Sequence, residues 1–289
     1  MNIDVYKLAI RLVHFRLFMT INLNHMPKIN LIVGGDSTIG RALADHWRDK
    51  KILFHASTRR RNQISPERPF IDLSLGCWPD NLDRYAGAVL CAGISRLAKC
   101  EHNIDDARRV NVTNTARLAK TLTESGCFVL FLSTNHVFDG TKPLRTVAES
   151  VCPINEYGRQ KAAAEKQLLP LQKLAILRLT KVVYREMPLL KHWRQDLLDG
   201  KVIYPFSDMT FAPIWLSEVI QCVDSLVNTP QHRHGIIHLS GQDQSYYDFA
   251  THLFADLARQ SHQIKPDSYK NTEALALIAI PKFTSLGSA

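Results

Sequence analysis

The sequence predicts an α/β protein built on a doubly wound parallel sheet, with a smaller C-terminal α/β region. Two observations support this prediction. From residue 29 onward, short apolar segments alternate with segments of helical periodicity. The apolar segments themselves show no polar alternation, which is typical of strands that a parallel sheet buries on both faces. The 289 residues are enough for one large domain or one and a half.

The first strand is expected at 29–33, where a β-branched apolar run ends in two glycines. A helix is expected at 38–50, because Ile39, Leu43 and Trp47 recur on one face. The same reasoning places further strands at 52–56, 69–72, 86–91, 128–133 and 174–179, and further helices at 104–124 and 155–169. A doubly wound sheet of this kind binds ligands at the carboxyl ends of its strands.

The rhythm of strands and helices loosens after residue 185. Helices are expected at 189–198, 217–227 and 246–260, the second of them capped by Ser217. Strands are expected at 201–205, 211–216 and 235–240. The tail from 261 has no clear pattern. Residues 1–26 could be a weak amphipathic targeting helix or non-native upstream sequence. We favour the second interpretation and leave this leader outside the fold.

Composition excludes several classes of function. The net charge of +9 is spread along the chain, and only 59–61 is a dense basic run, so we expect no nucleic acid as a partner. No apolar run approaches the ~20 residues that span a bilayer, so we expect no membrane partner. Six scattered cysteines without Cys-x-x-Cys predict reduced thiols in the cytoplasm. His232, His234 and His238 lack regularly spaced carboxylates, so no metal site is expected.

The segment 34–40, Gly-Gly-Asp-Ser-Thr-Ile-Gly, joins the first strand to the first helix. At such a turn, backbone N–H groups and a helix N-terminus can bind the pyrophosphate of a dinucleotide. A plain tight turn is the alternative. Serine stands where the middle glycine of the motif is expected, but it is small and can donate a hydrogen bond. We therefore expect cofactor contacts from Gly34, Ser37, Thr38, Ile39 and Gly40.

Arg59 and Arg60 follow the second strand, where an acid would hold the ribose 2′-hydroxyl of NAD. Guanidinium groups suit a 2′-phosphate instead, so we expect NADP, with NAD as the second choice. A solvated basic loop is the other interpretation. The ends of the next strands supply further expected contacts, to the adenine and along the dinucleotide, from Asp72, Leu73, Cys91, Ala92 and Gly93.

Tyr157 and Lys161 are four residues apart and therefore share one face of a helix. A phenol beside an ammonium loses its proton more easily than an isolated phenol. Such a pair suits proton transfer with an alcohol or carbonyl oxygen. Thr134 follows the strand at 128–133, and Asn111, in the preceding helix, is expected to be a structural hydrogen-bonding residue.

Two longer segments carry a resemblance to a known family. Residues 133–140 resemble Ser-Thr-Asp-Tyr-Val-Phe-Asp-Gly, and residues 153–165 resemble Pro-x-Asn-x-Tyr-Gly-x-x-Lys-x-x-x-Glu. These motifs are similar to those of the extended short-chain dehydrogenases/reductases, and within them of the dTDP-4-dehydrorhamnose reductase group. The resemblance covers about 28–285. Asn135 and His136 stand where that group has Asp and Tyr, and Ser37 stands where it has Gly.

The resemblance implies a Rossmann fold and an NADP-preferring reductase of a nucleotide-linked 4-keto sugar. It assigns the catalytic roles to Thr134, Tyr157 and Lys161, and the substrate contacts to Thr134, Asn135, His136 and Tyr157. Tyr157 would donate the proton. Lys161 would hold the nicotinamide ribose and lower the pKa of the tyrosine. Both residues would also contact the cofactor.

The resemblance leaves other functions open. An epimerase or dehydratase of the same superfamily uses the same trio, and a non-catalytic NADP-binding regulatory subunit could share the fold. A homodimer is also left open. We expect a dinucleotide-binding domain at 27–185 and a substrate-binding region at 186–289, in which about 211–245 returns to the first domain.

Overall fold

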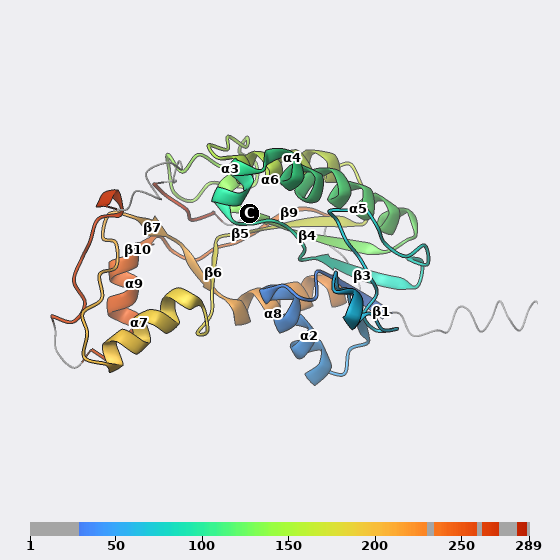
Figure 1. The fold of residues 1–289 in the computed structure, drawn as a ribbon. Coiled ribbons are helices and arrows are strands. Elements are labelled where there is room, and N and C mark those ends of the chain that lie inside the picture. Colours follow the sequence, from blue (N-terminus) through green and yellow to red (C-terminus); the bar gives the residue numbers. More distant parts are fainter. Residues whose placement is uncertain (1–28, 230–233, 259–261, 272–281, 288–289) are drawn as a thin grey trace, which may run out of the picture.

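A computed structural model describes residues 29–229, 234–258, 262–271 and 282–287 (Figure 1). The predicted leader at 1–26 and His232 lie outside these residues. A six-stranded parallel sheet, in the order β2-β1-β3-β4-β5-β9, forms the centre of the fold. Its strands are β1 (Ile29–Val33), β2 (Phe54–Ala56), β3 (Tyr85–Leu90), β4 (Phe128–Thr134), β5 (Leu174–Leu179) and β9 (Gly235–Leu239). No helix within the described ranges is long and apolar enough to span a bilayer.

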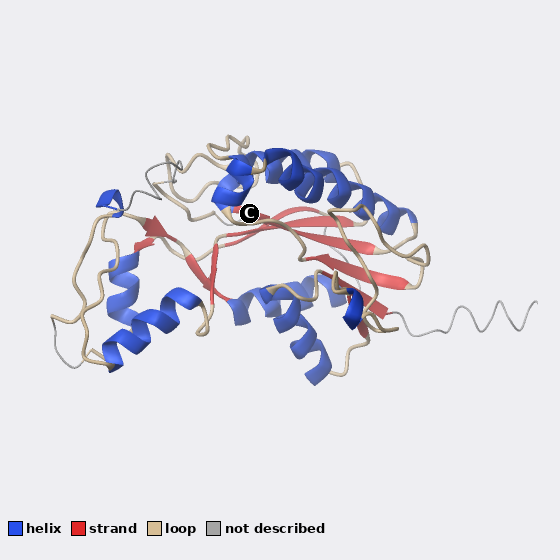
Figure 2. Ribbon diagram, viewed as in Figure 1, coloured by secondary structure: helices blue, strands red, loops and turns tan. Residues whose placement is uncertain are grey.

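Helices cover both faces of the sheet, as Figures 1 and 2 show. One face carries α2 (Thr38–Asp49) and α8 (Leu216–Asn228); the other carries α3 (Leu97–His102), α4 (Ile104–Arg108), α5 (Thr115–Glu124) and α6 (Glu156–Leu168). Alternate residues of β4 pack into two separate cores, Val129 and Phe131 on the α5–α6 side and Leu130 and Leu132 on the α2–α8 side. The predicted doubly wound α/β fold is confirmed.

A smaller lobe lies beyond one end of the central strands (Figure 1). It contains α7 (Pro188–Leu198), α9 (Tyr246–Leu253), the pair β7 (Thr210–Phe211) and β10 (Gln244–Ser245), and the pair β6 (Lys181–Val183) and β8 (Pro213–Trp215). Its own core includes Leu197, Phe211 and Phe249. The stacked rings of Phe211 and Tyr246, with centroids 4.0 Å apart, join β7 to α9. This lobe faces the carboxyl ends of the central strands.

The strand predicted at 69–72 is wrong. This segment runs beside the end of β2, but it makes only isolated bridges, Phe70 with Thr58 and Asp72 with Cys77. The N–H of Thr58 donates to the carbonyl of Pro69, and the N–H of Ile71 donates to the carbonyl of Thr58. Because Pro69 has no N–H of its own, it interrupts the pairing with β2 at this point.

The single helix predicted at 104–124 is also wrong in detail. It consists of α4, a π-helical segment at Arg109–Asn114 and then α5. π-Helical turns insert an extra residue and often occur at functional sites.

The remaining differences lie toward the C-terminal part of the chain. The predicted strand at 201–205 is an isolated bridge between Ile203 and Ile264, and the strand at 211–216 is divided between β7 and β8. The helix expected to begin after Ser217 begins at Leu216, because the carboxylate of Glu218 accepts from the N–H of Trp215. The last predicted helix ends at Leu253 rather than at 260.

Candidate active site

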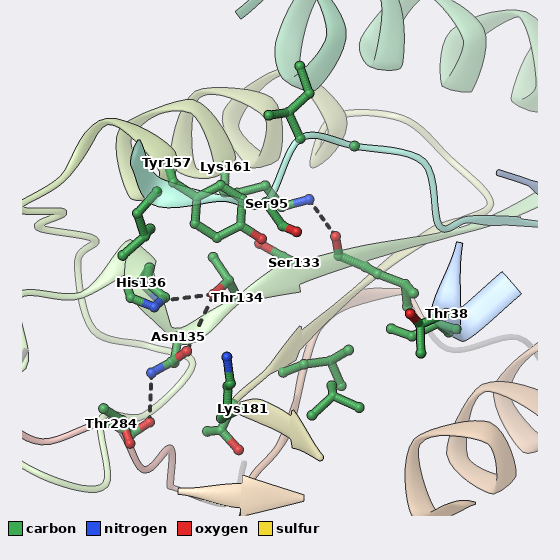
Figure 3. Close-up of a pocket in the computed structure, with 18 of the residues that line it drawn as sticks. Thr38, Ser95, Ser133, Thr134, Asn135, His136, Tyr157, Lys161, Lys181 and Thr284 are labelled. Atoms are coloured by element: carbon green, nitrogen blue, oxygen red, sulfur yellow. Dashed lines mark hydrogen bonds between the residues drawn. The ribbon is translucent and has the colours of Figure 1, made fainter. Parts of the chain in front are cut away.

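A cavity of about 490 Å³ opens at the carboxyl ends of β3, β4 and β5 (Figure 3). It brings together many of the residues singled out from the sequence: Ser37, Thr38, Ile39, Cys91, Ala92, Gly93, Asn111, Thr134, Asn135, His136, Tyr157 and Lys161. The predicted catalytic trio therefore shares one cavity with the glycine-rich turn. Gly34, Gly40, Arg59, Arg60, Asp72 and Leu73 are not among its lining residues.

Gly34 and Gly40 shape the turn rather than line the cavity. Gly34 has φ +87°, and a Cβ there would lie 2.7 Å from the backbone nitrogen of Ala92. A Cβ on Gly40 would lie 2.3 Å from the carbonyl oxygen of Gly34. Ser37 caps α2, since its Oγ accepts from the N–H of Gly40 at 3.0 Å. The hydroxyl can still donate its own proton, so the turn keeps the donors that a pyrophosphate needs.

The end of β2 carries charges of both signs. Arg59 and Arg60 are exposed there, which fits a 2′-phosphate site and a solvated basic loop equally, so their contact with the cofactor stays a prediction. The fold also brings Asp36 from the glycine turn to this place, where it pairs with Arg68 at 2.7 Å and accepts from the Thr58 hydroxyl at 2.7 Å. Burial opposes ionisation of Asp36, but these hydrogen bonds hold its pKa below the usual value. Sequence reasoning missed this carboxylate because it lies 22 positions before Thr58.

Asp72 and Leu73 lie away from the cavity. Asp72 Oδ1 accepts from both the N–H and the hydroxyl of Ser74, and Leu73 is 4% exposed within the core beneath α5 and α6. Their assignment to the adenine stays a prediction.

The loop after β3 is held by Asn111. The amide oxygen of Asn111 accepts from the N–H of Ile94 at 2.8 Å, and its amide nitrogen donates to the Ile94 carbonyl and to Gln160 Oε1. These bonds tie the cavity wall to α6, which fits the structural role expected for Asn111. Nearby, burial raises the pKa of Cys91 to about 12, so its thiol stays protonated and is not a nucleophile.

Thr134 ends β4 and caps a short 3₁₀ turn that contains Asn135 and His136. Thr134 Oγ1 accepts from the N–H of His136 at 3.2 Å and donates to Asn135 Oδ1 at 3.3 Å. The Asn135 amide nitrogen donates to the carbonyl of Thr284 at 3.0 Å, which fixes the orientation of the amide (Figure 3). The turn is therefore tied to a segment that comes much later in the chain.

His136 is held as a neutral ring. Asn155 Oδ1 accepts from the N–H of Gly158, so Asn155 Nδ2 must be the donor to His136 Nδ1, at 3.1 Å. The ring proton of His136 is consequently on Nε2. Burial, together with the charge of Lys181, lowers the pKa of His136 to about 4. The ring lies edge-on to Tyr157, with centroids 5.9 Å apart.

Tyr157 and Lys161 share one face of α6, as expected, but the predicted effect on the tyrosine pKa is wrong. Burial raises the pKa of Tyr157 to about 12, and a hydrogen bond with Thr134 opposes this only in part. The ammonium of Lys161 donates to the carbonyl of Leu132 at 2.5 Å and lies 3.8 Å from the centroid of the Phe131 ring (Figure 3). Burial lowers the pKa of Lys161 to about 7, although Glu165 opposes the shift. The phenol is therefore fully protonated at neutral pH.

A buried polar network lies behind these residues. Arg178 and Glu165, each 2% exposed, form a two-pronged ion pair in which Nη2 donates to Oε2 at 2.6 Å. Ser133 donates to Glu165 Oε1 at 2.5 Å. Arg178 Nη1 also donates to His238 Nε2, whose Nδ1 then donates to the carbonyl of Gly287. The network joins β4, β5, β9 and α6 beneath the predicted catalytic trio.

The opposite wall of the cavity comes from residues that sequence reasoning missed. They include Thr180, Lys181, Tyr184, Met209, Thr210, Phe211, Tyr246 and Thr284. These residues belong to four separate stretches of chain with no common spacing. Only Thr180 and Lys181 carried a usable signal, because they directly follow the strand predicted at 174–179.

The parallel sheet, the glycine turn at its first crossover and the Tyr157–Lys161 pair beside Thr134 define a dinucleotide-binding protein of the extended short-chain dehydrogenase/reductase class. Residues 28–278 match the RmlD substrate binding domain family, and the chain belongs to that family.

Three similar proteins illustrate the range of its relatives. A dTDP-4-keto-6-deoxy-D-glucose reductase from Streptomyces niveus is 31% identical over 82% of this chain and 81% of its own. Methionine adenosyltransferase 2 subunit beta from Rattus norvegicus is 32% identical over 114 residues, which are 39% of this chain but only 34% of that protein. The crystal structure of a dTDP-4-dehydrorhamnose reductase from Bacillus anthracis in complex with NADP superposes with a TM-score of 0.75 at 19% identity, and covers 91% and 92% of the two chains.

Proposed function

We propose that this protein is an NADPH-dependent reductase of a nucleotide-linked 4-keto sugar. The observation that carries the proposal is the meeting of Thr134, Tyr157 and Lys161 in one cavity with the glycine-rich turn. The Streptomyces niveus relative, similar over four fifths of both chains, is named as a reductase of such a sugar. The six free thiols fit the cytoplasmic location expected from the sequence. The homodimer stays a prediction.

The residues present fit a dinucleotide. A side chain on Gly34 would collide with Ala92, so only glycine allows this tight turn, which places Ser37 and Thr38 in the cavity. Ser37 and Thr38 would hold the phosphates, and Arg59 and Arg60 a 2′-phosphate. The nicotinamide, when bound, supplies the hydride.

The protein's own side chains supply the proton that the reaction needs. Tyr157 holds it at neutral pH, because burial keeps the phenol far above its usual pKa. As the C4 carbonyl becomes an alkoxide, the phenol gives its proton to the new oxygen, and an alcohol results. The hydroxyl of Thr134 turns from Asn135 to donate to the same oxygen. Lys161, on the same helix face as Tyr157, would hold the nicotinamide ribose and so keep the cofactor beside the phenol.

A second candidate function is a non-catalytic NADP-binding regulatory subunit. The local similarity to the rat methionine adenosyltransferase subunit favours it, although that similarity spans only 114 residues. The intact Thr134, Tyr157 and Lys161 set favours the reductase, since a subunit that only binds the cofactor needs no proton donor.

The test is NADPH oxidation, followed at 340 nm, with dTDP-4-keto-6-deoxyglucose and a panel of related keto sugar nucleotides. Tyr157→Phe should lower turnover by ~10²–10⁴ and leave the Kd for NADPH nearly unchanged. Tyr204→Phe is the matched control, because Tyr204 is 56% exposed and does not line the cavity. Full activity in Tyr157→Phe would refute the mechanism. Tight NADPH binding without turnover of any sugar in the panel would favour the regulatory subunit.

A further inference from the structure

Lys181 occupies the wall of the cavity that faces the catalytic trio. It begins β6, where its N–H donates to the carbonyl of Ala212 at 3.2 Å and its backbone pairs with Pro213. The strand therefore holds its Cα in place. Figure 3 shows the side chain directed across the cavity toward the segment that carries Thr134 and Asn135.

The ammonium of Lys181 has no counterion in the part of the chain that the structure describes. No hydrogen bond or ion pair joins its Nζ to a described residue, and no aspartate or glutamate is among the residues lining the cavity. Lys161 differs, because its ammonium already has the carbonyl of Leu132. The cavity walls lower the pKa of Lys181 through partial desolvation, but the residue as a whole is exposed, so its ammonium is open to a ligand that enters the cavity.

Asn135 lies on the segment toward which the Lys181 side chain is directed (Figure 3). The related reductase motif has Asp at this position, and so would place a carboxylate on that segment. The amide instead is neutral, and its two ends are already used by Thr134 and Thr284. With Asn instead of Asp at position 135, this end of the cavity has one negative charge fewer than the reductase motif would give it. A ligand that carries that charge would restore the balance.

We propose that Lys181 binds a carboxylate on the sugar, so that the substrate is a nucleotide-linked 4-keto uronate rather than a neutral 4-keto sugar. This inference rests on the proposed function, because it uses Thr134 and Tyr157 to locate the reacting carbonyl. The carboxylate of a uronate is attached to C5, next to the C4 carbonyl. The diphosphate is attached to C1, on the far side of the ring, and so lies away from Thr134.

The experiment measures binding, because 4-keto uronates are β-keto acids that lose carbon dioxide. The probes are dTDP-glucuronic acid and dTDP-glucose, with the two uridine analogues run in parallel. Each is titrated calorimetrically into the NADPH-bound protein, which cannot transfer hydride to an alcohol. We expect the glucuronate to bind about tenfold more tightly than the neutral sugar. Lys181→Met should abolish the difference, and Lys181→Arg should retain most of it.

Lys166→Met is the matched control, since Lys166 is exposed near the end of α6 and does not line the cavity. Melting temperatures of all variants show whether each is folded. Equal affinities for the acidic and neutral members of both pairs would overturn the proposal, and so would undetectable binding of both members. So would an equal loss for both sugars in Lys181→Met, because that would assign the cation to the diphosphate.

Failure of the reductase proposal gives a different result. In that case NADPH binds and no keto sugar is turned over, while the preference for glucuronate and its loss in Lys181→Met can still be measured. Conversely, brisk reduction of a neutral 4-keto sugar with no preference for the acid would leave the reductase intact and remove only the carboxylate site.

Discussion

Removal of the Glu165 carboxylate should destabilise the protein strongly. Glu165→Ala leaves the Arg178 guanidinium at 2% exposure without its counterion, and it also removes the acceptor for the Ser133 hydroxyl. Breaking a buried ion pair from one side costs about 3–5 kcal/mol. In a protein of this size each kcal/mol lowers the melting temperature by ~2–4 °C, so we expect a fall of about 6–20 °C.

Differential scanning calorimetry at pH 7 measures this effect, with two comparison variants. Glu124→Ala removes an exposed carboxylate 3.8 Å from Lys120 and should cost under ~0.5 kcal/mol. The double variant Glu165→Leu with Arg178→Met replaces the pair by apolar groups and should recover much of the loss. A shift in Glu165→Ala no larger than that of Glu124→Ala would refute the reasoning, since it would mean that the Arg178 charge is solvated after all.

Further predictions concern charge at the site. Arg59→Ala should weaken NADPH binding about tenfold with little effect on NADH binding. Asp36→Asn should tighten NADPH binding, because it removes a negative charge next to the expected 2′-phosphate site. Fluorescence titrations that show an unchanged ratio of the Kd values for NADPH and NADH would contradict both expectations. The pKa of His136 is about 4 folded and ~6.5 unfolded, so the unfolded chain binds more protons between these values and stability should fall as pH drops through this window. The loss is about 2 kcal/mol after allowance for the ring surface that faces the cavity, and urea unfolding of His136→Phe should lack it. NADPH binding should take up a proton near pH 7, because the cofactor's phosphates favour the charged form of Lys161, whose pKa burial lowers to about 7; binding heats that do not depend on the ionisation enthalpy of the buffer would rule this out.

Local chemistry made much of the cofactor half predictable. β1, its glycine turn and α2 follow one another within 21 residues. The residues that signal them therefore stand next to one another in the sequence: the β-branched strand residues, Gly34, which adopts a positive φ, and Ser37, which caps the helix. The helix with Tyr157 and Lys161 was predictable for the same reason.

Features that depend on distant parts of the chain were not predictable. The pKa of Tyr157 was misjudged because burial, which only the folded chain provides, outweighs the effect of a neighbouring lysine. Asp36 reaches the end of β2 only through the fold. The π-helical segment around Asn111 depends on bonds to Ile94 and Gln160, and a periodicity count has no access to such bonds.

The bond between Asn135 and Thr284 links residues 149 positions apart, and it has a consequence for the order in which the site forms. Contacts of such long sequence separation close late in folding, because the entropy of the intervening chain opposes them. On a ribosome that adds about 5–20 residues per second, β1 to β5 and the glycine turn are all synthesised many seconds before Thr284. We expect the cofactor site to form on the growing chain before the sugar site does. A nascent protein could then bind the dinucleotide while it still cannot bind the sugar substrate.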